Sequence, residues 1–106
     1  MSSPSPTERL AEGWHLSSVL IVDDEQGMRN FLEKTLASRC GEVHGADSAE
    51  AAERLVRTHR YDLVILDITL PGKSGIVFLR ELREQGYTGE VVLITAFADL
   101  DTAIEA

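Results

Sequence analysis

Three short apolar runs, each followed at once by a polar residue, constrain the fold of this chain more than any other feature. The runs are Val19–Val22, Leu63–Leu66 and Val91–Ile94. Unbroken runs of branched apolar residues, without polar alternation, are typical of strands that are buried on both faces of a sheet. Such strands occur mainly in parallel sheets, so the sequence predicts an α/β domain.

The segment between the first two strands has the period of an amphipathic helix, which we expect over residues 26–38. Its apolar residues fall on one helical stripe. They are Met28, Phe31, Leu32 and Leu36. Gly41 closes this helix, and a short strand is expected over Glu42–Ala46.

Two further helices are expected farther along the chain. Asp47 and Glu50 have the D-x-x-E spacing of a capping box, so a helix should begin there. Another is expected over residues 76–85, before Gly86. Its inward-facing residues are predicted to be Phe78, Leu79 and Leu82.

Strands that alternate with helices through short links predict a doubly wound parallel sheet with helices on both faces. In such sheets the functional site lies beyond the carboxyl ends of the strands. Polar residues stand at three of these ends, namely Asp23 with Asp24, Asp67 and Thr95. We therefore expect these side chains to converge.

The two ends of the sequence differ from its middle. Residues 1–16 contain Pro4 and Pro6 before any periodic pattern appears, so we expect a mobile lead-in there. The domain is expected over residues 17–106. Its last helix should begin near Leu100, after an Asp99 cap, and still be running at Ala106.

Composition excludes several classes of function. A chain of 106 residues has the length of one domain. Ten Lys and Arg against eighteen Asp and Glu give a net charge of −8, so this domain should repel nucleic acid. The single cysteine, Cys40, excludes an internal disulfide and fits a reducing compartment. The apolar runs are far shorter than the roughly 20 residues of a membrane span, so we expect no membrane contact and a cytoplasmic location.

The carboxylates at the strand ends predict a metal site. Three acids at one sheet edge repel one another unless a cation joins them. Hard oxygen ligands in small number suit Mg²⁺, which often binds beside phosphate. A carboxylate beside Mg²⁺ can attack phosphorus, and the Thr95 hydroxyl could then donate to a phosphoryl oxygen.

The three histidines are not expected to bind a metal. His15, His44 and His59 fall in the lead-in, a strand and a helix, and no ligand spacing connects them. No His or Cys neighbours the three strand ends either, so zinc and copper are not expected at the acidic site.

The sequence resembles the receiver domains of two-component response regulators. The motifs that carry the resemblance are Leu20–Glu25 (LIVDDE), Leu63–Asp67 (LVILD) with Leu70-Pro71-Gly72 and Ser74-Gly75 beyond it, and Leu93–Ala96 (LITA). The likeness covers residues 17–106. It implies a flavodoxin-like fold with strand order 2-1-3-4. Residues 95–106 further resemble receivers of nitrogen-regulation-type transcriptional activators.

The resemblance implies a role for each polar residue at the strand ends. Asp67 would accept a phosphoryl group from the phosphohistidine of a sensor kinase. Asp24 would bind Mg²⁺ directly, together with Asp67 and the Thr69 carbonyl oxygen, and Asp23 would act through a metal-bound water. Thr95 would be the switch hydroxyl, and the Ala96 amide would donate to the phosphoryl group. Such a chain is not an enzyme beyond its own phosphorylation and slow dephosphorylation.

The chain also departs from this family. Receivers continue into a fifth strand, which carries a lysine that contacts the phosphoryl group, and a fifth helix. This sequence ends before both, so we expect an incomplete site and a parent protein that continues into a C-terminal output domain, which would make any DNA contact. Lys73 matches no family lysine and is expected to be a solvated loop cation. Without a fifth strand, the strand at Val91–Ile94 would be a bare edge, so we expect self-association through it.

Two other functions compete with the phosphorylated switch. Leu66–Leu70 prompts comparison with Mg²⁺-dependent phosphohydrolases of the haloacid-dehalogenase type. That family has a second acid two residues after its nucleophile, where this chain has Thr69, and its nucleophile follows the first strand. The third hypothesis is a receiver-like interaction module that is never phosphorylated.

Overall fold

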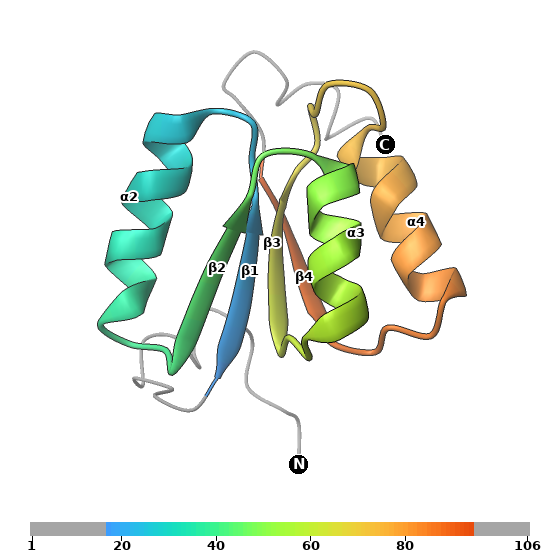
Figure 1. Ribbon diagram of the computed structural model, residues 1–106. Coiled ribbons are helices and arrows are strands. Elements are labelled where there is room, and N and C mark those ends of the chain that lie inside the picture. Colours follow the sequence, from blue (N-terminus) through green and yellow to red (C-terminus); the bar gives the residue numbers. More distant parts are fainter. Residues whose placement is uncertain (1–16, 95–106) are drawn as a thin grey trace.

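The computed structural model describes residues 17–94 of the 106-residue chain, and within this range strands and helices alternate (Figure 1). In chain order the elements are β1 (Ser18–Val22), α2 (Gln26–Ala37), β2 (Glu42–Ala46), α3 (Ala49–Thr58), β3 (Leu63–Asp67), α4 (Gly75–Glu84) and β4 (Glu90–Ile94). The strands and helices expected within this range are therefore present. The expected lead-in at 1–16 and the helix expected from Leu100 lie outside the described residues.

The strands form one parallel sheet in the order β2-β1-β3-β4. Ile21 of β1 pairs with Gly45 of β2 on one side and with Ile65 of β3 on the other. Figure 1 shows α2 on one face of the sheet and α3 and α4 on the other. The predicted doubly wound α/β sheet with strand order 2-1-3-4 is confirmed.

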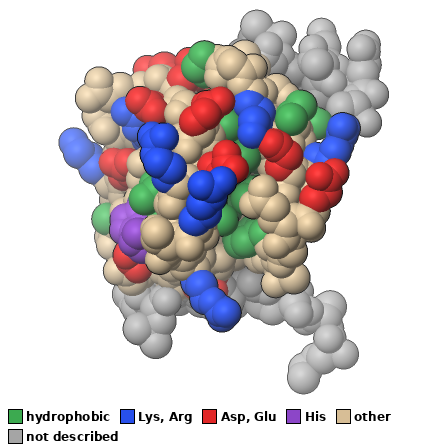
Figure 2. All heavy atoms as spheres, turned by 45° about the vertical axis from the view of Figure 1, so that its right-hand side comes forward, with side chains coloured by type: hydrophobic (Ala, Val, Ile, Leu, Met, Phe, Trp, Pro, Cys, Tyr) green, Lys and Arg blue, Asp and Glu red, His purple; other side chains and the backbone are tan. Residues whose placement is uncertain are grey.

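The outer surface of α3 and α4 carries basic and acidic side chains interleaved with one another (Figure 2). One such pair joins Arg57 to Glu53, with 3.0 Å between Nη2 and Oε1 one helical turn apart. Within residues 17–94, no helix has both the length and the apolar character needed to cross a membrane.

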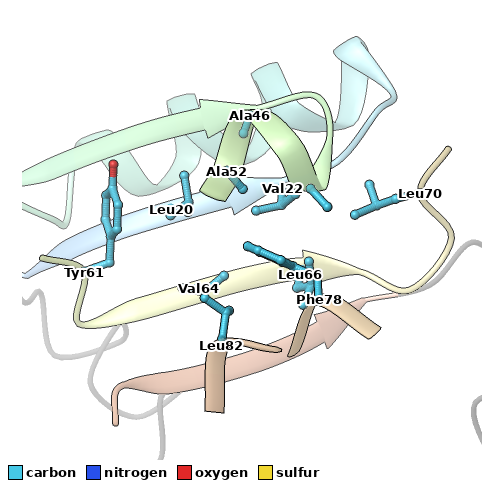
Figure 3. Packing of buried hydrophobic residues seen from close by; sticks show 11 residues of the cluster. Leu20, Val22, Ala46, Ala52, Tyr61, Val64, Leu66, Leu70, Phe78 and Leu82 are labelled. Carbon is cyan, nitrogen blue, oxygen red and sulfur yellow. The ribbon is translucent and has the colours of Figure 1, made fainter. Parts of the chain in front are cut away.

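The core beneath α3 and α4 is built from alternate residues of the two central strands (Figure 3). Side chains alternate between the faces of a strand, so every second residue of β1 and β3 points this way. The strand residues are Leu20, Val22, Val64 and Leu66. The buried residues that pack against them are Ala46, Ala49, Ala52, Tyr61, Leu70, Phe78 and Leu82. Burial of Phe78 and Leu82 fixes α4 against the strand that ends in Asp67.

The other residues of the central strands form a second core beneath α2. Val19, Ile21, Leu63 and Ile65 pack there with Leu36 and Cys40. Each apolar residue of the Val19–Val22 and Leu63–Leu66 runs is buried, so the prediction of strands covered on both faces is confirmed.

The apolar stripe predicted for the first helix is only half buried. Leu36 is buried and Leu32 partly buried, whereas Met28 is 43% and Phe31 63% exposed. Charged side chains of α2 lie against β2 at Gly45, which has no side chain. A Cβ atom there would overlap Glu33 of α2, so the charged face of the helix lies over the glycine.

The helix cap predicted at Asp47 is wrong by one residue. Ser48 is the N-cap of α3, and its hydroxyl accepts a hydrogen bond from Ala51 N at 3.1 Å. Its extended backbone, with φ −155° and ψ 164°, is the conformation that an N-cap requires. Glu50 then lies in the first turn, where its charge favours the positive end of the helix.

The strand β4 is less buried than the central strands. Within residues 17–94 it pairs with β3 on one side, and Leu93 is 38% exposed. Self-association through this strand stays a prediction.

Candidate functional site

Three carboxylates meet at the carboxyl edge of the two central strands. Asp23 and Asp24 directly follow β1, and Asp67 is the last residue of β3. Val22 pairs with Leu66 in register, so the next residue of each strand reaches the same edge. One carboxylate oxygen from each of the three acids lies within 4.8 Å of the others. We call this group the acidic trio.

The three acids of the trio differ in how deeply they are buried. Asp23 is buried with 3% of its surface exposed, Asp67 is partly buried, and Asp24 is exposed. The site therefore has a buried floor and an open side toward solvent.

Asp23, the buried floor of the site, is held by hydrogen bonds to backbone groups and to Arg29. Asp23 N donates to the Ala46 carbonyl oxygen at 3.0 Å, and Asp23 Oδ1 accepts from Glu25 N at 2.9 Å. The Asp23 carbonyl oxygen accepts from Arg29 Nη1 at 2.8 Å. These contacts fix the Asp23 carboxylate beside Asp67.

The next acid along the chain, Glu25, has a structural role. Glu25 is the N-cap of α2, and its carboxylate accepts from Gly27 N at 3.2 Å and from Met28 N at 3.0 Å. The acidic run Asp23–Glu25 thus divides into two site residues and one helix cap, because both kinds of position favour carboxylates.

Asp67 is positioned by the loop that follows it. Its Oδ1 accepts a hydrogen bond from Thr69 N at 3.0 Å. The start of α4 packs against the same backbone, where Gly75 N donates to the Ile68 carbonyl oxygen at 2.9 Å. A Cβ atom on Gly75 would overlap the Asp67 carbonyl oxygen, so only glycine allows this approach.

The environment raises the pKa of the Asp67 carboxyl from 3.8 to about 6. Burial is the largest cause, and the hydrogen bond from Thr69 N opposes it. The negative charges of Asp23 and Asp24, and a hydrogen bond with the Asp23 side chain, raise the pKa further. A cation between the three carboxylates would relieve this repulsion.

The donor set of the trio fits Mg²⁺. It offers carboxylate oxygens within 4.8 Å of one another, and one of the three acids is exposed, which leaves room for metal-bound water. Oxygen-only ligands favour Mg²⁺ over zinc or copper.

Lys73 is not the solvated cation that the sequence suggested. Its Nζ lies 2.6 Å from Glu81 Oε1 on α4 and 4.0 Å from Glu53 Oε2 on α3, and 27% of its side chain is exposed. The hydrogen bond to Glu81 and the neighbouring acids raise the pKa of Lys73. The lysine therefore links the loop after β3 to both helices of that face.

Two predicted site residues, Thr95 and Ala96, lie outside the described residues. The strand that precedes them reaches the site, because Ile94 pairs with Asp67 in register. The Ile94 carbonyl oxygen also accepts from Ile68 N at 2.9 Å.

The acidic trio lies on an open edge, and a separate pocket lies at the other end of the sheet. That pocket is lined by residues from the end of α3, the segment just before β3 and the loop after α4, among them Arg57, Tyr61, Asp62 and Tyr87. An open edge is suited to a reaction partner that is itself a protein side chain.

Sequence reasoning missed one cluster of potential ligands. Glu42, His44 and His59 each place one ligand atom within 4.8 Å of the other two. As expected, no ligand spacing connects His44 and His59 in the sequence, and the fold alone brings them together. Glu42 and His44 are two apart on a strand and so share a face, but the partner at the end of the following helix has no local signal.

Comparison with known proteins identifies the family. Residues 19–106 match the response regulator receiver domain family. The chain belongs to this family. The expected resemblance to receiver domains is thereby confirmed.

Curated relatives are much longer than this chain. Regulatory protein AtoC of Escherichia coli is 36% identical over 91 residues, which are 86% of this chain and 20% of AtoC. Response regulator protein PilR of Pseudomonas aeruginosa is 36% identical over 87 residues, or 82% of this chain and 20% of PilR. The chain thus spans about a fifth of the length of these two relatives.

Solved receiver structures share the fold. Response regulator TrrA of Thermotoga maritima, in complex with Mg²⁺ and BeF, superposes with a TM-score of 0.74 at 33% identity, covering 82% of this chain and 76% of that one. NtrX of Brucella abortus, in complex with ADP, gives a TM-score of 0.77 at 29% identity, covering 85% and 21%. AtoC and NtrX fit the expected likeness to nitrogen-regulation-type receivers.

Proposed function

We propose that this receiver domain accepts a phosphoryl group on Asp67 from the phosphohistidine of a sensor histidine kinase, in a Mg²⁺-dependent reaction. The acidic trio is the observation that carries the proposal. It joins one partly buried carboxylate to two others within 4.8 Å. TrrA, which was solved with Mg²⁺ and BeF, supports the choice of metal by analogy.

The residues have separate roles in this proposal. Asp24, Asp67 and the Thr69 carbonyl oxygen would hold Mg²⁺, and Asp23 would act through a metal-bound water. The metal, when bound, neutralises the negative charge of the carboxylate and of the incoming phosphoryl group. Asp23, fixed by Glu25 N and Ala46 O, orients the site, and the Thr69 amide holds one oxygen of Asp67.

Phosphoryl transfer exchanges one bond for another. A carboxylate oxygen of Asp67 forms a bond to phosphorus as the bond between phosphorus and the imidazole nitrogen of the kinase histidine breaks. The electron pair of the broken bond stays on the imidazole. The open edge of the trio admits the kinase side chain.

We propose that residues outside the trio respond to phosphorylation. Thr95 is the proposed switch hydroxyl and the Ala96 amide a proposed donor to the phosphoryl group, which adds a dianionic group to the site. We further propose a C-terminal output domain, since AtoC and PilR are about five times longer than the matched region. We also propose that this output domain regulates transcription and that the protein is located in the cytoplasm.

Intact-mass spectrometry tests the proposed acceptor. The chain is incubated with acetyl phosphate, with and without Mg²⁺, beside Asp67→Asn and the control Glu25→Gln, which alters the α2 cap but not the trio. We expect one added phosphoryl group that requires both Mg²⁺ and Asp67 and that persists in the control.

Other outcomes would favour the competing functions. Release of many equivalents of inorganic phosphate per chain would indicate a phosphohydrolase. Absence of an adduct at every Mg²⁺ concentration, with the protein folded, would favour an interaction module that is not phosphorylated.

A further inference from the structure

A second cluster of ligand side chains lies on β2 and the end of α3. Glu42 and His44 are two residues apart on β2, and His59 is the C-cap residue of α3. One ligand atom from each lies within 4.8 Å of the others. In Figure 2, histidine side chains form a purple patch at the surface. We call Glu42, His44 and His59 the histidine cluster.

The two imidazoles are close enough to share one ion. Their ring centroids are 4.9 Å apart and their planes are inclined by 79°. Two imidazoles bound tetrahedrally through nitrogen at about 2.0–2.1 Å have ring centroids about 5 Å apart. The third member is adjacent, with Glu42 Oε1 2.9 Å from His44 Nε2.

Neighbouring groups occupy the other nitrogen of each ring. His44 Nδ1 lies 2.6 Å from the Tyr61 hydroxyl oxygen. His59 Nδ1 lies 3.3 Å from the Leu55 carbonyl oxygen and 2.9 Å from the Thr58 hydroxyl oxygen. Histidines that bind metals usually donate the second ring N–H to such groups, which fixes the ring and its tautomer. Nε2 is therefore the nitrogen of each ring that we assign to a metal.

We propose that Glu42, His44 and His59 bind one divalent transition-metal ion of the zinc class, with water as a fourth ligand. Two imidazoles and one carboxylate form a donor set that suits zinc, whereas Mg²⁺ prefers oxygen ligands. The site is separate from the acidic trio and does not rest on the proposed phosphorylation.

Metal binding changes the hydrogen bonds of His44. In the tautomer with its proton on Nε2, His44 donates to Glu42 Oε1 and its Nδ1 accepts from the Tyr61 hydroxyl. A metal on Nε2 moves the ring proton to Nδ1, from which it donates to the Tyr61 oxygen. This change of tautomer can be observed directly.

The proposed ion would join an edge strand to the helix that follows it. Within the described residues, β2 is an outer strand of the sheet and pairs with β1. A metal bound by β2 and by the C-cap residue of α3, His59, would hold the two together. The consequence is greater stability of this edge in the presence of zinc.

Calorimetric titration with ZnCl₂ at pH 7.5, in excess Mg²⁺ to occupy the trio, tests the site. We expect one equivalent to bind, with the affinity reduced by more than about tenfold in Glu42→Gln and in His59→Gln. Both positions are exposed, so these variants should fold. Matched controls are His15→Gln, Asp67→Asn and Cys40→Ser, each of which should retain wild-type affinity. Burial raises the pKa of the Cys40 thiol, which disfavours the thiolate that zinc would bind.

Nitrogen NMR of the imidazoles provides a second readout. On addition of zinc, the Nε2 signals of His44 and His59 should shift, and the His44 proton should move from Nε2 to Nδ1. Unchanged affinity in both ligand variants, loss of binding in His15→Gln, or a His44 tautomer that does not respond to zinc would each overturn the proposal.

Discussion

Gly75 packs directly against the backbone of Asp67, and a Cβ atom at Gly75 would overlap the Asp67 carbonyl oxygen. The first turn of α4 is therefore in contact with the residue that we propose as phosphoryl acceptor. Any side chain at Gly75 must move either the helix or the end of β3.

The first prediction follows from this contact. Gly75→Ala should lower the free energy of unfolding by roughly 2–3 kcal/mol, because the backbone clash outweighs the about 0.5–1 kcal/mol that alanine gains in a helix. Urea denaturation measures the change. Gly27→Ala in α2 is the control, because its added Cβ would meet the Glu25 side chain and no backbone. Disturbing the Glu25 cap costs about 1 kcal/mol, which the about 0.5–1 kcal/mol that alanine gains in a helix largely offsets, so the variant should change the free energy of unfolding by less than about 1 kcal/mol. Equal stability of the two variants would contradict the close approach.

The second prediction concerns pH in metal-free protein. The pKa of Asp67 is about 6 in the folded chain and near 3.8 when unfolded, so the folded state binds the proton more tightly. The contribution of this group to stability is therefore lost as pH rises from about 4 to 6. Asp67→Asn has no carboxyl group to ionise, so its stability does not fall in this pH range. It should be more stable than wild type at pH 7.5, by on the order of 1–2 kcal/mol after allowance for partial exposure.

Denaturation of both proteins in EDTA at pH 4 and at pH 7.5 checks this. The advantage of Asp67→Asn should be present at pH 7.5 and small at pH 4. An advantage that is the same at both pH values would show that repulsion and burial of the charge are not its cause.

The third prediction concerns the metal. Mg²⁺ should raise the melting temperature of the wild-type chain at pH 7.5, because it binds the folded trio, and saturation at 100 times the dissociation constant corresponds to about 2.7 kcal/mol. Asp24→Asn should weaken the response strongly. Asp47→Asn, an exposed acid at the end of β2 and outside the trio, should leave it intact. A response to Mg²⁺ that is equal in all three chains would indicate general screening of negative charge.

The fourth prediction distinguishes two neighbouring helix caps. Ser48→Ala should lower the free energy of unfolding by about 1 kcal/mol, because Ala51 N loses its acceptor. Asp47→Ala should change it by less than about 0.5 kcal/mol, as is usual for exposed surface residues. Thermal denaturation of both variants shows which residue is the cap. A larger loss of stability in Asp47→Ala than in Ser48→Ala would identify Asp47 as the N-cap, as expected from sequence.

The buried part of the fold was predictable from sequence because its signal is local. The unbroken run Leu63–Leu66 is buried on both faces as expected, and parallel topology alone brings Asp67 beside Asp23 and Asp24. Family resemblance added the proposed role of each acid, which spacing cannot supply.

The failures are positions where a non-local contact or a competing local one decides the outcome. Phe31 fits the apolar stripe of α2, yet it is exposed because Gly45 lets the charged face of the helix lie over β2. Ser48 and Asp47 are both good caps, and backbone conformation selects the serine. His44 and His59 meet only through the packing of α3, so no sequence spacing reveals them.

The fifth prediction concerns the edge strand β4. Within residues 17–94 it pairs with β3 on one side, and its apolar Leu93 is 38% exposed. Exposed edges with apolar side chains tend to pair with other chains, and a lysine on the edge opposes this. We therefore expect the 106-residue chain to self-associate, and Leu93→Lys to reduce the association.

Sedimentation velocity over a range of concentrations measures both, with Val77→Lys on the exposed face of α4 as a control of equal charge. A wild-type chain that stays monomeric at high concentration would refute association, and an equal effect of both lysines would assign it to charge rather than to β4.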